Sequence, residues 1–172
     1  MVGEEFITLD NFVLPAPEEL IERPPMKAKI VKIEIKKEKS RFEDRMDTNI
    51  HIYTLTQDTE EKRPFHMIYR YSTRKNSKFG QFILKVYELT KEAPEIQKPI
   101  KLDNLIGTTW TWEFKERMLG NVKSAFWLPI EYHGKEPVTT EELQTVEDWI
   151  KQREEAKKLE EHTEIGGTID QL

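Results

Sequence analysis

A regular alternation of apolar and polar residues predicts five β-strands in this chain. The clearest example is residues 28–37, where Val31, Ile33 and Ile35 alternate with lysine and glutamate side chains. The same period of two marks four further segments, residues 49–56, 65–71, 109–115 and 122–130. Because successive side chains of a pleated strand point to opposite faces, this period indicates strands with one buried face. The chain is therefore predicted to be mainly β.

An apolar stripe at three- and four-residue spacing predicts a helix between the third and fourth strands. Its members are Phe79, Phe82, Ile83, Val86 and Leu89. Ser77 is placed to cap the first turn, because a serine oxygen can accept a hydrogen bond from an N–H group that has no partner within the helix. The stripe must be buried, so we expect this helix to pack on the sheet.

A second helix is predicted near the C-terminus, with Thr139 or Thr140 as its cap and an end at about His162. Its apolar stripe consists of Leu143, Val146, Trp149 and Ile150. Beyond this stripe, glutamate and lysine recur four residues apart, which is typical of a solvent-exposed helix. Gly166 and Gly167 then predict a loose end.

The length of 172 residues fits one domain with extended ends. We divide the chain into an extended acidic arm with prolines at residues 1–25, a β domain at 26–137, and a C-terminal helix with an acidic tail at 138–172. We expect both tails to be flexible. The arm contains an apolar patch at residues 6–14, which either has no role or binds a sheet edge or a partner.

Charge is segregated along the chain. Residues 26–137 carry 22 basic and 16 acidic side chains, a net charge of +6, whereas residues 1–25 carry −5 and residues 138–172 carry −6. The cations are concentrated in residues 62–91, which contain eight basic side chains and one acidic. A basic centre predicts a surface for a polyanion, and the acidic ends predict competition for that surface.

The sequence lacks the features of secreted and membrane proteins. It contains no cysteine, which excludes disulfides and thiolate zinc sites. Residues 1–20 show no basic region followed by an apolar run, and no segment approaches the roughly 20 apolar residues of a membrane helix. We therefore expect an intracellular, cytoplasmic protein that does not bind membranes.

Motifs of common enzymes are also missing. There is no glycine-rich phosphate loop, no Gly-x-Ser-x-Gly elbow and no His-Glu-x-x-His helix. His51 and His66 fall on neighbouring predicted strands, but two histidines without placed carboxylates are a weak metal site. We predict no catalytic residue, no metal and no cofactor.

The order of the predicted elements, three strands, a helix and two more strands, resembles the oligonucleotide/oligosaccharide-binding (OB) fold. That fold is a five-stranded barrel with a helix between strands three and four. The resemblance covers residues 26–137 and is to the single-stranded-DNA-binding proteins of this fold, particularly the short ones of phages and archaea. Bacterial proteins of this class end in an acidic stretch closed by Pro-Phe, and residues 168–172 depart from that pattern.

The resemblance implies a binding surface across the second and third strands. The loop between strands one and two and the loop between strands four and five would flank it. Cations would contact phosphates and rings would stack on bases. The positions that fit are Lys36, Lys39, Arg41, Phe42, Arg45, Tyr69, Arg70, Tyr71, Arg74, Arg117, Lys123 and Trp127.

Several aromatic residues have an alternative place in the core. Phe42 either stacks on a base or packs inside. Tyr69 and Tyr71 share one face of the third strand, and the pattern does not decide whether that face points inward. Three aromatic residues of the fourth strand, Trp110, Trp112 and Phe114, favour the core, because burying aromatic rings is the largest apolar contribution available to a small barrel.

These observations lead to two hypotheses. The first is a non-catalytic, largely sequence-independent binder of single-stranded nucleic acid, DNA or RNA, with DNA favoured, acting in DNA replication or repair. The alternative is an OB-like adaptor module whose acidic tails dock protein partners. A homo-oligomer is compatible with both. The two hypotheses differ in where they place four arginines: Arg41, Arg70, Arg74 and Arg117. Nucleic-acid binding predicts that these side chains converge on one groove beside an exposed ring, whereas scattered arginines would favour the adaptor.

Overall fold

The structure is a computed structural model that describes residues 23–40, 44–57, 60–97, 100–119 and 122–171, with the side chains of 117–119, 122–124 and 160–171 excepted. Within these residues the elements follow the order β2 (Met26–Lys39), β3 (Met46–Thr56), β4 (Pro64–Arg70), α3 (Lys78–Leu89), α4 (Pro94–Gln97), η1 (Leu102–Leu105), β5 (Thr108–Leu119), β6 (Val122–Lys135) and α5 (Thr140–Gln171). The five predicted strands and the two predicted helices are all present.

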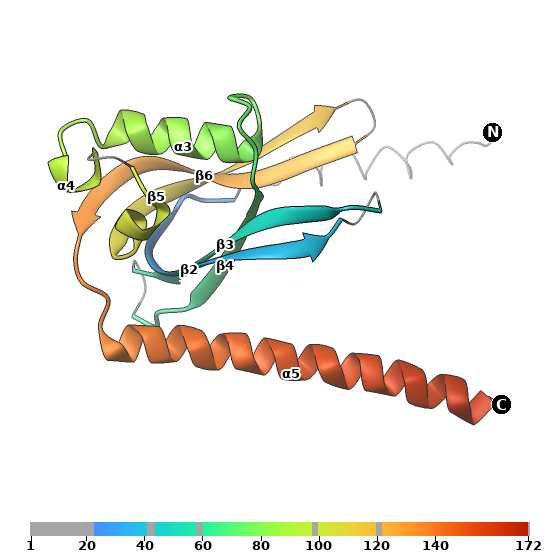
Figure 1. Ribbon diagram of the computed structural model, residues 1–172. Helices are drawn as coiled ribbons and strands as arrows, with labels where there is room; N and C mark the ends of the chain where they lie inside the picture. Colours follow the sequence, from blue (N-terminus) through green and yellow to red (C-terminus); the bar gives the residue numbers. More distant parts are fainter. Residues whose placement is uncertain (1–22, 41–43, 58–59, 98–99, 120–121, 172) are drawn as a thin grey trace, which may run out of the picture.

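The strands form one antiparallel sheet in the order β4-β3-β2-β5-β6. β2 and β3 form one hairpin, and β5 and β6 form another. The two hairpins are joined where the first residues of β2, Met26 to Lys29, pair with Trp112 to Thr109 of β5. Beyond this junction the hairpins diverge (Figure 1). Among the described residues no ladder joins β4 to β6, so the sheet is not closed.

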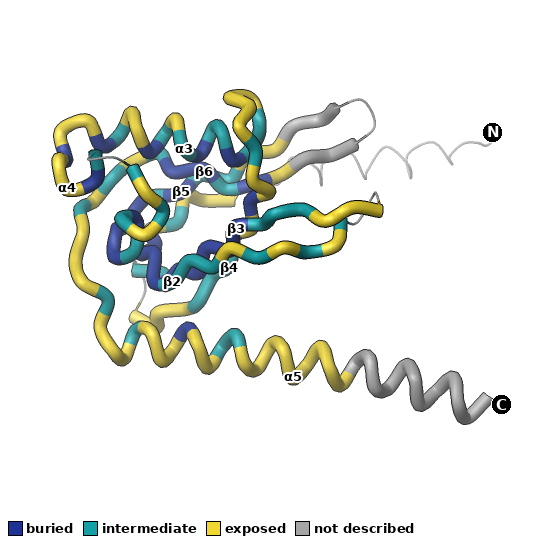
Figure 2. Tube along the Cα trace, in the orientation of Figure 1, coloured by how far each residue is buried: buried dark blue, intermediate teal, exposed yellow. Residues whose placement is uncertain are grey.

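Helices α3 and α5 lie on opposite sides of the sheet (Figure 1). Phe82 of α3 stacks on Tyr69 and Trp112, with ring centroids 4.9 and 6.1 Å apart, and this helix covers the main core. α5 covers a smaller cluster on the other side, built from Val31, Tyr53, Leu55 and Val146. Figure 2 shows the buried segments concentrated between the two helices, whereas α5 becomes exposed along its length.

Both predicted helix caps are confirmed. The Ser77 hydroxyl accepts a hydrogen bond from the Gly80 N–H at 2.9 Å. At the start of α5, the Thr139 hydroxyl accepts from the Glu142 N–H at 3.1 Å, while the Glu142 carboxylate accepts from the Thr139 N–H at 3.0 Å. This reciprocal pair is a capping box, so Thr139 rather than Thr140 is the N-cap of the helix.

The boundaries differ from the prediction in three places. The predicted loop at 91–102 contains the short helix α4, and η1 occupies part of the predicted turn that follows. The predicted hairpin tip at 116–121 is mostly strand, because β5 and β6 continue to pair out to Leu119 and Val122. α5 continues to Gln171, past the predicted end, because two glycines weaken a helix without breaking it and no proline follows Pro137.

The prediction that Val31, Ile33 and Ile35 share one face of the first strand is wrong for Val31. The register of β2 against β3 shifts between Ile30 and Lys32, which is a β-bulge. Val31 therefore packs beneath α5, while Ile33 packs against the main core. Ile35 is 62% exposed because the hairpin has already left the core at that point.

None of the described helices combines the length and the apolarity needed to cross a membrane.

Candidate nucleic-acid interface

The surface that the resemblance implies is the side of β2, β3 and β4 facing away from the main core, here called the outer face. Register places its residues in cross-strand rows. One row runs from Lys36 through Asn49 to Arg70, and the next runs from Glu34 through His51 to Ile68. The rows combine cationic, polar and apolar side chains, and Ile68 is 50% exposed.

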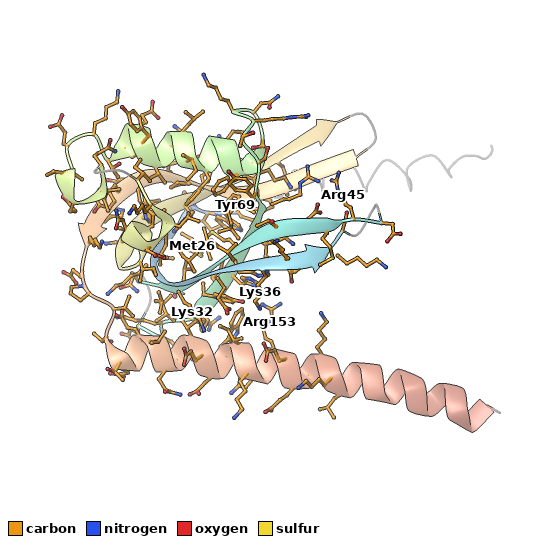
Figure 3. The ribbon with its side chains drawn as sticks, in the orientation of Figure 1. Met26, Lys32, Lys36, Arg45, Tyr69 and Arg153 are labelled. Carbon is orange, nitrogen blue, oxygen red and sulfur yellow. The ribbon has the colours of Figure 1, made fainter. Side chains whose placement is uncertain are left out.

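Three of the predicted cations lie on the β2–β3 hairpin, and each has a carboxylate beside it. These pairs are Lys36–Glu34 at 3.9 Å, Lys39–Asp44 at 4.0 Å and Arg45–Asp47 at 3.1 Å. In Figure 3, Lys36 lies between the hairpin and α5, whereas Arg45 lies near the loop end of the hairpin. Exposed pairs of this kind are weak, so their cations can exchange a carboxylate for a phosphate at little cost.

Two further predicted cations lie at the end of β4 and just beyond it. Arg70 ends the strand on the outer face, and Arg74 lies in the segment that leads into α3; both are exposed. Arg41 and Phe42 lie outside the described residues. Arg117 and Lys123 pair with Ser124 and Met118 in the β5–β6 hairpin, where side chains are not described. Of the four arginines that separate the two hypotheses, the structure brings Arg70 and Arg74 to one end of β4.

Of the four predicted stacking rings the structure describes three, and two of these are engaged in packing. Tyr69 is 1% exposed and stacks on Phe82, and its hydroxyl donates a hydrogen bond to the Trp127 carbonyl oxygen. Its assignment as a base-stacking residue is wrong, because its face of β4 points into the core. Trp127 is half-buried and packs on Phe65 and Phe114.

Tyr71 alone among these rings is well exposed, at 54%, and its ring lies 5.7 Å from that of Phe79. Trp110 and Trp112, by contrast, are fully buried, which confirms their predicted place in the core.

The structure also reveals an aromatic ladder that the sequence reasoning missed. The rings of His51, Tyr53 and His66 are nearly parallel, with centroids 5.0 Å apart for His51–His66 and 4.4 Å for Tyr53–His66. The period of two puts His51 and Tyr53 on one face of β3, but it does not show which residues of β4 lie beside them. Their stacking depends on the register of β3 against β4, in which Tyr53 lies opposite His66.

α5 packs on one end of this ladder. The Trp149 ring meets Tyr53 and His66 edge-on, at 6.4 and 6.3 Å, and the Arg153 guanidinium lies 4.6 Å above Trp149. Glu147 reaches Lys32 at 3.4 Å. Figure 3 shows Lys32, Lys36 and Arg153 in the space between the sheet and the helix.

The first turn of α5 is held by a buried ion pair. Lys29 Nζ lies 2.9 Å from Glu142 Oε1, and the two side chains are only 7% and 11% exposed. Lys29 also donates to the Pro137 carbonyl oxygen at 3.1 Å. Burial opposes ionisation of Glu142, but the Thr139 N–H and Lys29 outweigh it and hold the pKa of this carboxyl below its usual range. Glu142 is therefore ionised at neutral pH, and its contact with Lys29 anchors the helix.

A chain of hydrogen bonds connects α5 to the far side of the outer face. Arg153 Nη1 lies 3.3 Å from His66 Nδ1, His66 Nε2 lies 2.8 Å from His51 Nδ1, and His51 Nε2 lies 2.7 Å from Glu38 Oε1. Arginine can only donate, so His66 Nδ1 must accept, and His66 Nε2–H then donates to His51. A proton on His66 Nδ1 would face the guanidinium and break the chain at Arg153.

The surroundings of His66 oppose its protonation. Burial, followed by the charges of His51, Arg153 and Lys36, lowers the pKa of His66 to about 4, and the Glu38 carboxylate only partly offsets this. The Asn49 amide, which donates to Glu38 at 2.8 Å, lowers the pKa of that carboxyl. Burial raises the pKa of Tyr53 to about 12. At neutral pH His66 and Tyr53 are therefore uncharged, which suits these two rings for stacking.

Among the described residues, no three histidine, aspartate or glutamate side chains converge as metal ligands. Comparisons with protein-family models, with curated proteins and with solved structures found no match to this chain. The assignment of function therefore depends on the geometry of the outer face and on the strand order.

We predict that acidification weakens the fold through His66. Its pKa in the folded protein, about 4, lies below the ordinary 6.5. As the pH falls from 6.5 to 4, the unfolded chain takes up a proton that the folded protein excludes, so stability is lost across this window. Because His66 is partly exposed, we expect a loss of about 1 to 2 kcal/mol, measured by urea unfolding at several pH values.

The variant His66→Gln should flatten this dependence. His133→Gln, which removes an exposed histidine of β6, is the matched control and should retain it. An equal pH dependence in wild type and His66→Gln would contradict the interpretation.

A second prediction concerns the anchor of α5. Glu142→Ala leaves Lys29 buried without its partner and removes half of the capping box, so we expect the free energy of unfolding to fall by roughly 2 to 4 kcal/mol. Glu141→Ala removes an exposed carboxylate from the same helical turn and should cost no more than about 0.5 kcal/mol. Chemical denaturation of the two variants measures the difference, and similar losses would show that the pair contributes little.

Proposed function

We propose that this chain is a non-catalytic protein that binds single-stranded nucleic acid, DNA in preference, on the outer face and largely without regard to sequence. The observation that carries the proposal is the strand order β4-β3-β2-β5-β6 with α3 inserted between the third and fourth strands. This neighbour order fits an OB barrel, whose binding surface is centred on the second and third strands. Here those strands are β3 and β4.

Side chains at the open seam support an OB-like barrel. The Tyr69 hydroxyl of β4 donates to the Trp127 carbonyl oxygen of β6, and the Phe65 and Trp127 rings meet edge-on at 5.4 Å. We propose that these contacts close the barrel where backbone pairing does not. The OB fold is itself described as a partly open barrel.

The chemistry of the outer face supports a single-stranded ligand. Lys36 and Arg70 provide cations in one row of the face, and beyond the end of β4 the Arg74 side chain and the Tyr71 ring, which contacts Phe79 of α3, are exposed. A single strand offers unpaired bases for stacking and phosphates for these cations, whereas the bases of a duplex are already stacked. The proposed preference for DNA over RNA is based only on the resemblance to single-stranded-DNA-binding proteins of the OB fold.

The contacts of α5 restrict the alternative, an adaptor whose acidic tails dock protein partners. The carboxylates of Glu142 and Glu147 are already engaged with Lys29 and Lys32, so part of the acidic C-terminal region is occupied within the chain. A protein partner would have to use the acidic residues that lie further along α5. Partner binding without any nucleic-acid binding would favour this alternative.

A fluorescence titration with single-stranded and duplex oligonucleotides tests the proposal. Single strands should bind more tightly, with an affinity that falls as salt rises, because each neutralised phosphate releases counterion with a slope of about −0.7 in log–log form. Contacts from three cations predict a slope of roughly −2. No detectable binding of single strands at low salt would reject the proposal.

Tyr71 is the ring whose loss should weaken binding with least effect on the fold. We expect Tyr71→Ala to lower the affinity for single strands by roughly 1 to 3 kcal/mol, the range for one lost base stack. Tyr87→Ala is the matched control, because Tyr87 is equally exposed, at 53% against 54%, but lies on α3. Equal affinities for the two variants would exclude Tyr71 from the interface.

A further inference from the structure

α5 covers one half of the outer face and leaves the other half open. Beneath it lie Tyr53, which is 4% exposed, and His66, which is half-buried. Further along the same strands, Ile68 and Arg70 are exposed. The aromatic ladder therefore starts under the helix and continues toward the open part of the surface. A strand that crosses the whole outer face would meet α5.

The contacts that α5 makes are of the same chemical kinds as those of a nucleic-acid strand. The Trp149 ring covers two rings of the ladder, although it meets them edge-on where a base would stack face to face. The Glu147 carboxylate contacts Lys32 as a phosphate oxygen would. Arg153 does not fit this likeness, since it is a cation, but its contact with His66 Nδ1 fixes the helix on the ladder.

The attachment of α5 weakens along its length. Its beginning is held by the buried Lys29–Glu142 pair and by the fully buried Val146. From residue 147 onward the contacts are partly solvated: the Lys32 and Glu147 side chains are 30% and 46% exposed, and the Arg153–His66 contact is long at 3.3 Å. Segments with few buried contacts open locally at low free energy, so residues 147–153 can leave while the first turns remain.

We propose that residues 147–153 of α5, here called the cover segment, are a removable lid over a second base-stacking subsite formed by Tyr53 and His66, with Lys32 as its phosphate contact. This inference rests on the proposed function and adds to it a regulated half of the binding surface. The ligand chemistry is an unpaired nucleobase with its adjoining phosphate. Only the open form has the subsite. The apparent affinity of the subsite is therefore its intrinsic affinity multiplied by the fraction of molecules that are open.

The variant Arg153→Ala tests the proposal, because it should change the affinity for single-stranded DNA in the opposite direction to an ordinary loss of a cation. Removing a cation normally weakens binding to a polyanion. If Arg153 fixes the cover segment, Arg153→Ala should instead tighten the binding of single-stranded DNA, by roughly fivefold or more for a typical coupling between sites. Lys157→Ala is the matched control, because it removes an exposed cation from the next turn of the same helix and should leave binding unchanged or weaker.

The gain should depend on the subsite beneath. In the Arg153→Ala background, Tyr53→Leu keeps an apolar side chain on the sheet but removes the ring, so the added affinity should disappear. Circular dichroism and urea unfolding of each variant show that the fold is retained. If Arg153→Ala binds no more tightly than wild type, the cover-segment proposal is overturned while the proposed function stands.

A tether provides a second, independent measurement on the full chain. The protein contains no cysteine, so Lys32→Cys with Glu147→Cys introduces the only two thiols. A short, cleavable thiol cross-linker between them should hold the cover segment closed and weaken binding, and cleavage should restore it in the same sample. The Lys32 contact is missing from both states, so the change reports access to the Tyr53 and His66 rings alone. Equal affinity before and after cleavage would overturn the proposal. Absence of binding in wild type and in every variant would reject the proposed function, and this inference with it.

Discussion

The burial of β3 on both of its faces is the constraint on which the rest of the structure depends. Ile50 and Ile52 point into the main core, while Tyr53 and Leu55 point the other way, and all four are less than 5% exposed. A strand with two apolar faces cannot lie on the surface of a single-layer sheet. It requires α3 and the β5–β6 hairpin on one side and α5 on the other, so the C-terminal helix completes the domain.

The elements themselves followed from the sequence because each depends on local rules. Period-two alternation located five strands, three- and four-residue spacing located α3 and α5, and the cap at Ser77 was read directly from its position. The features that the sequence does not predict depend on contacts between segments that are far apart in the chain. The bulge at Val31 shifts the strand's register by one residue, and only the partner strand and the helix that covers it show why Val31 faces outward.

The site was harder to predict than the fold, for a physical reason. Cations such as Arg70 and Arg74 can be identified from composition, because solvated charges stay on the surface. Aromatic residues cannot, since the same ring serves a core or a binding surface. Tyr69 and Tyr71 are two residues apart and share one face of the predicted third strand. Tyr69 is buried against Phe82, whereas Tyr71 is 54% exposed, because β4 ends at Arg70, between them.

The charge segregation seen in the sequence has a direct counterpart in the described structure. The acidic beginning of α5 lies on the basic sheet, where Glu142 and Glu147 pair with Lys29 and Lys32. These two pairs respond differently to salt. The Lys29–Glu142 pair is buried, so salt affects its attraction little. The Lys32–Glu147 pair is exposed, and salt ions weaken its attraction, since the screening length is about 10 Å at 0.1 M salt. Ionic strength therefore acts on the two ends of the docked helix unequally. Higher salt, which would weaken the proposed phosphate contacts on the outer face, therefore also weakens the Lys32–Glu147 pair at the start of residues 147–153, while the Lys29–Glu142 anchor persists.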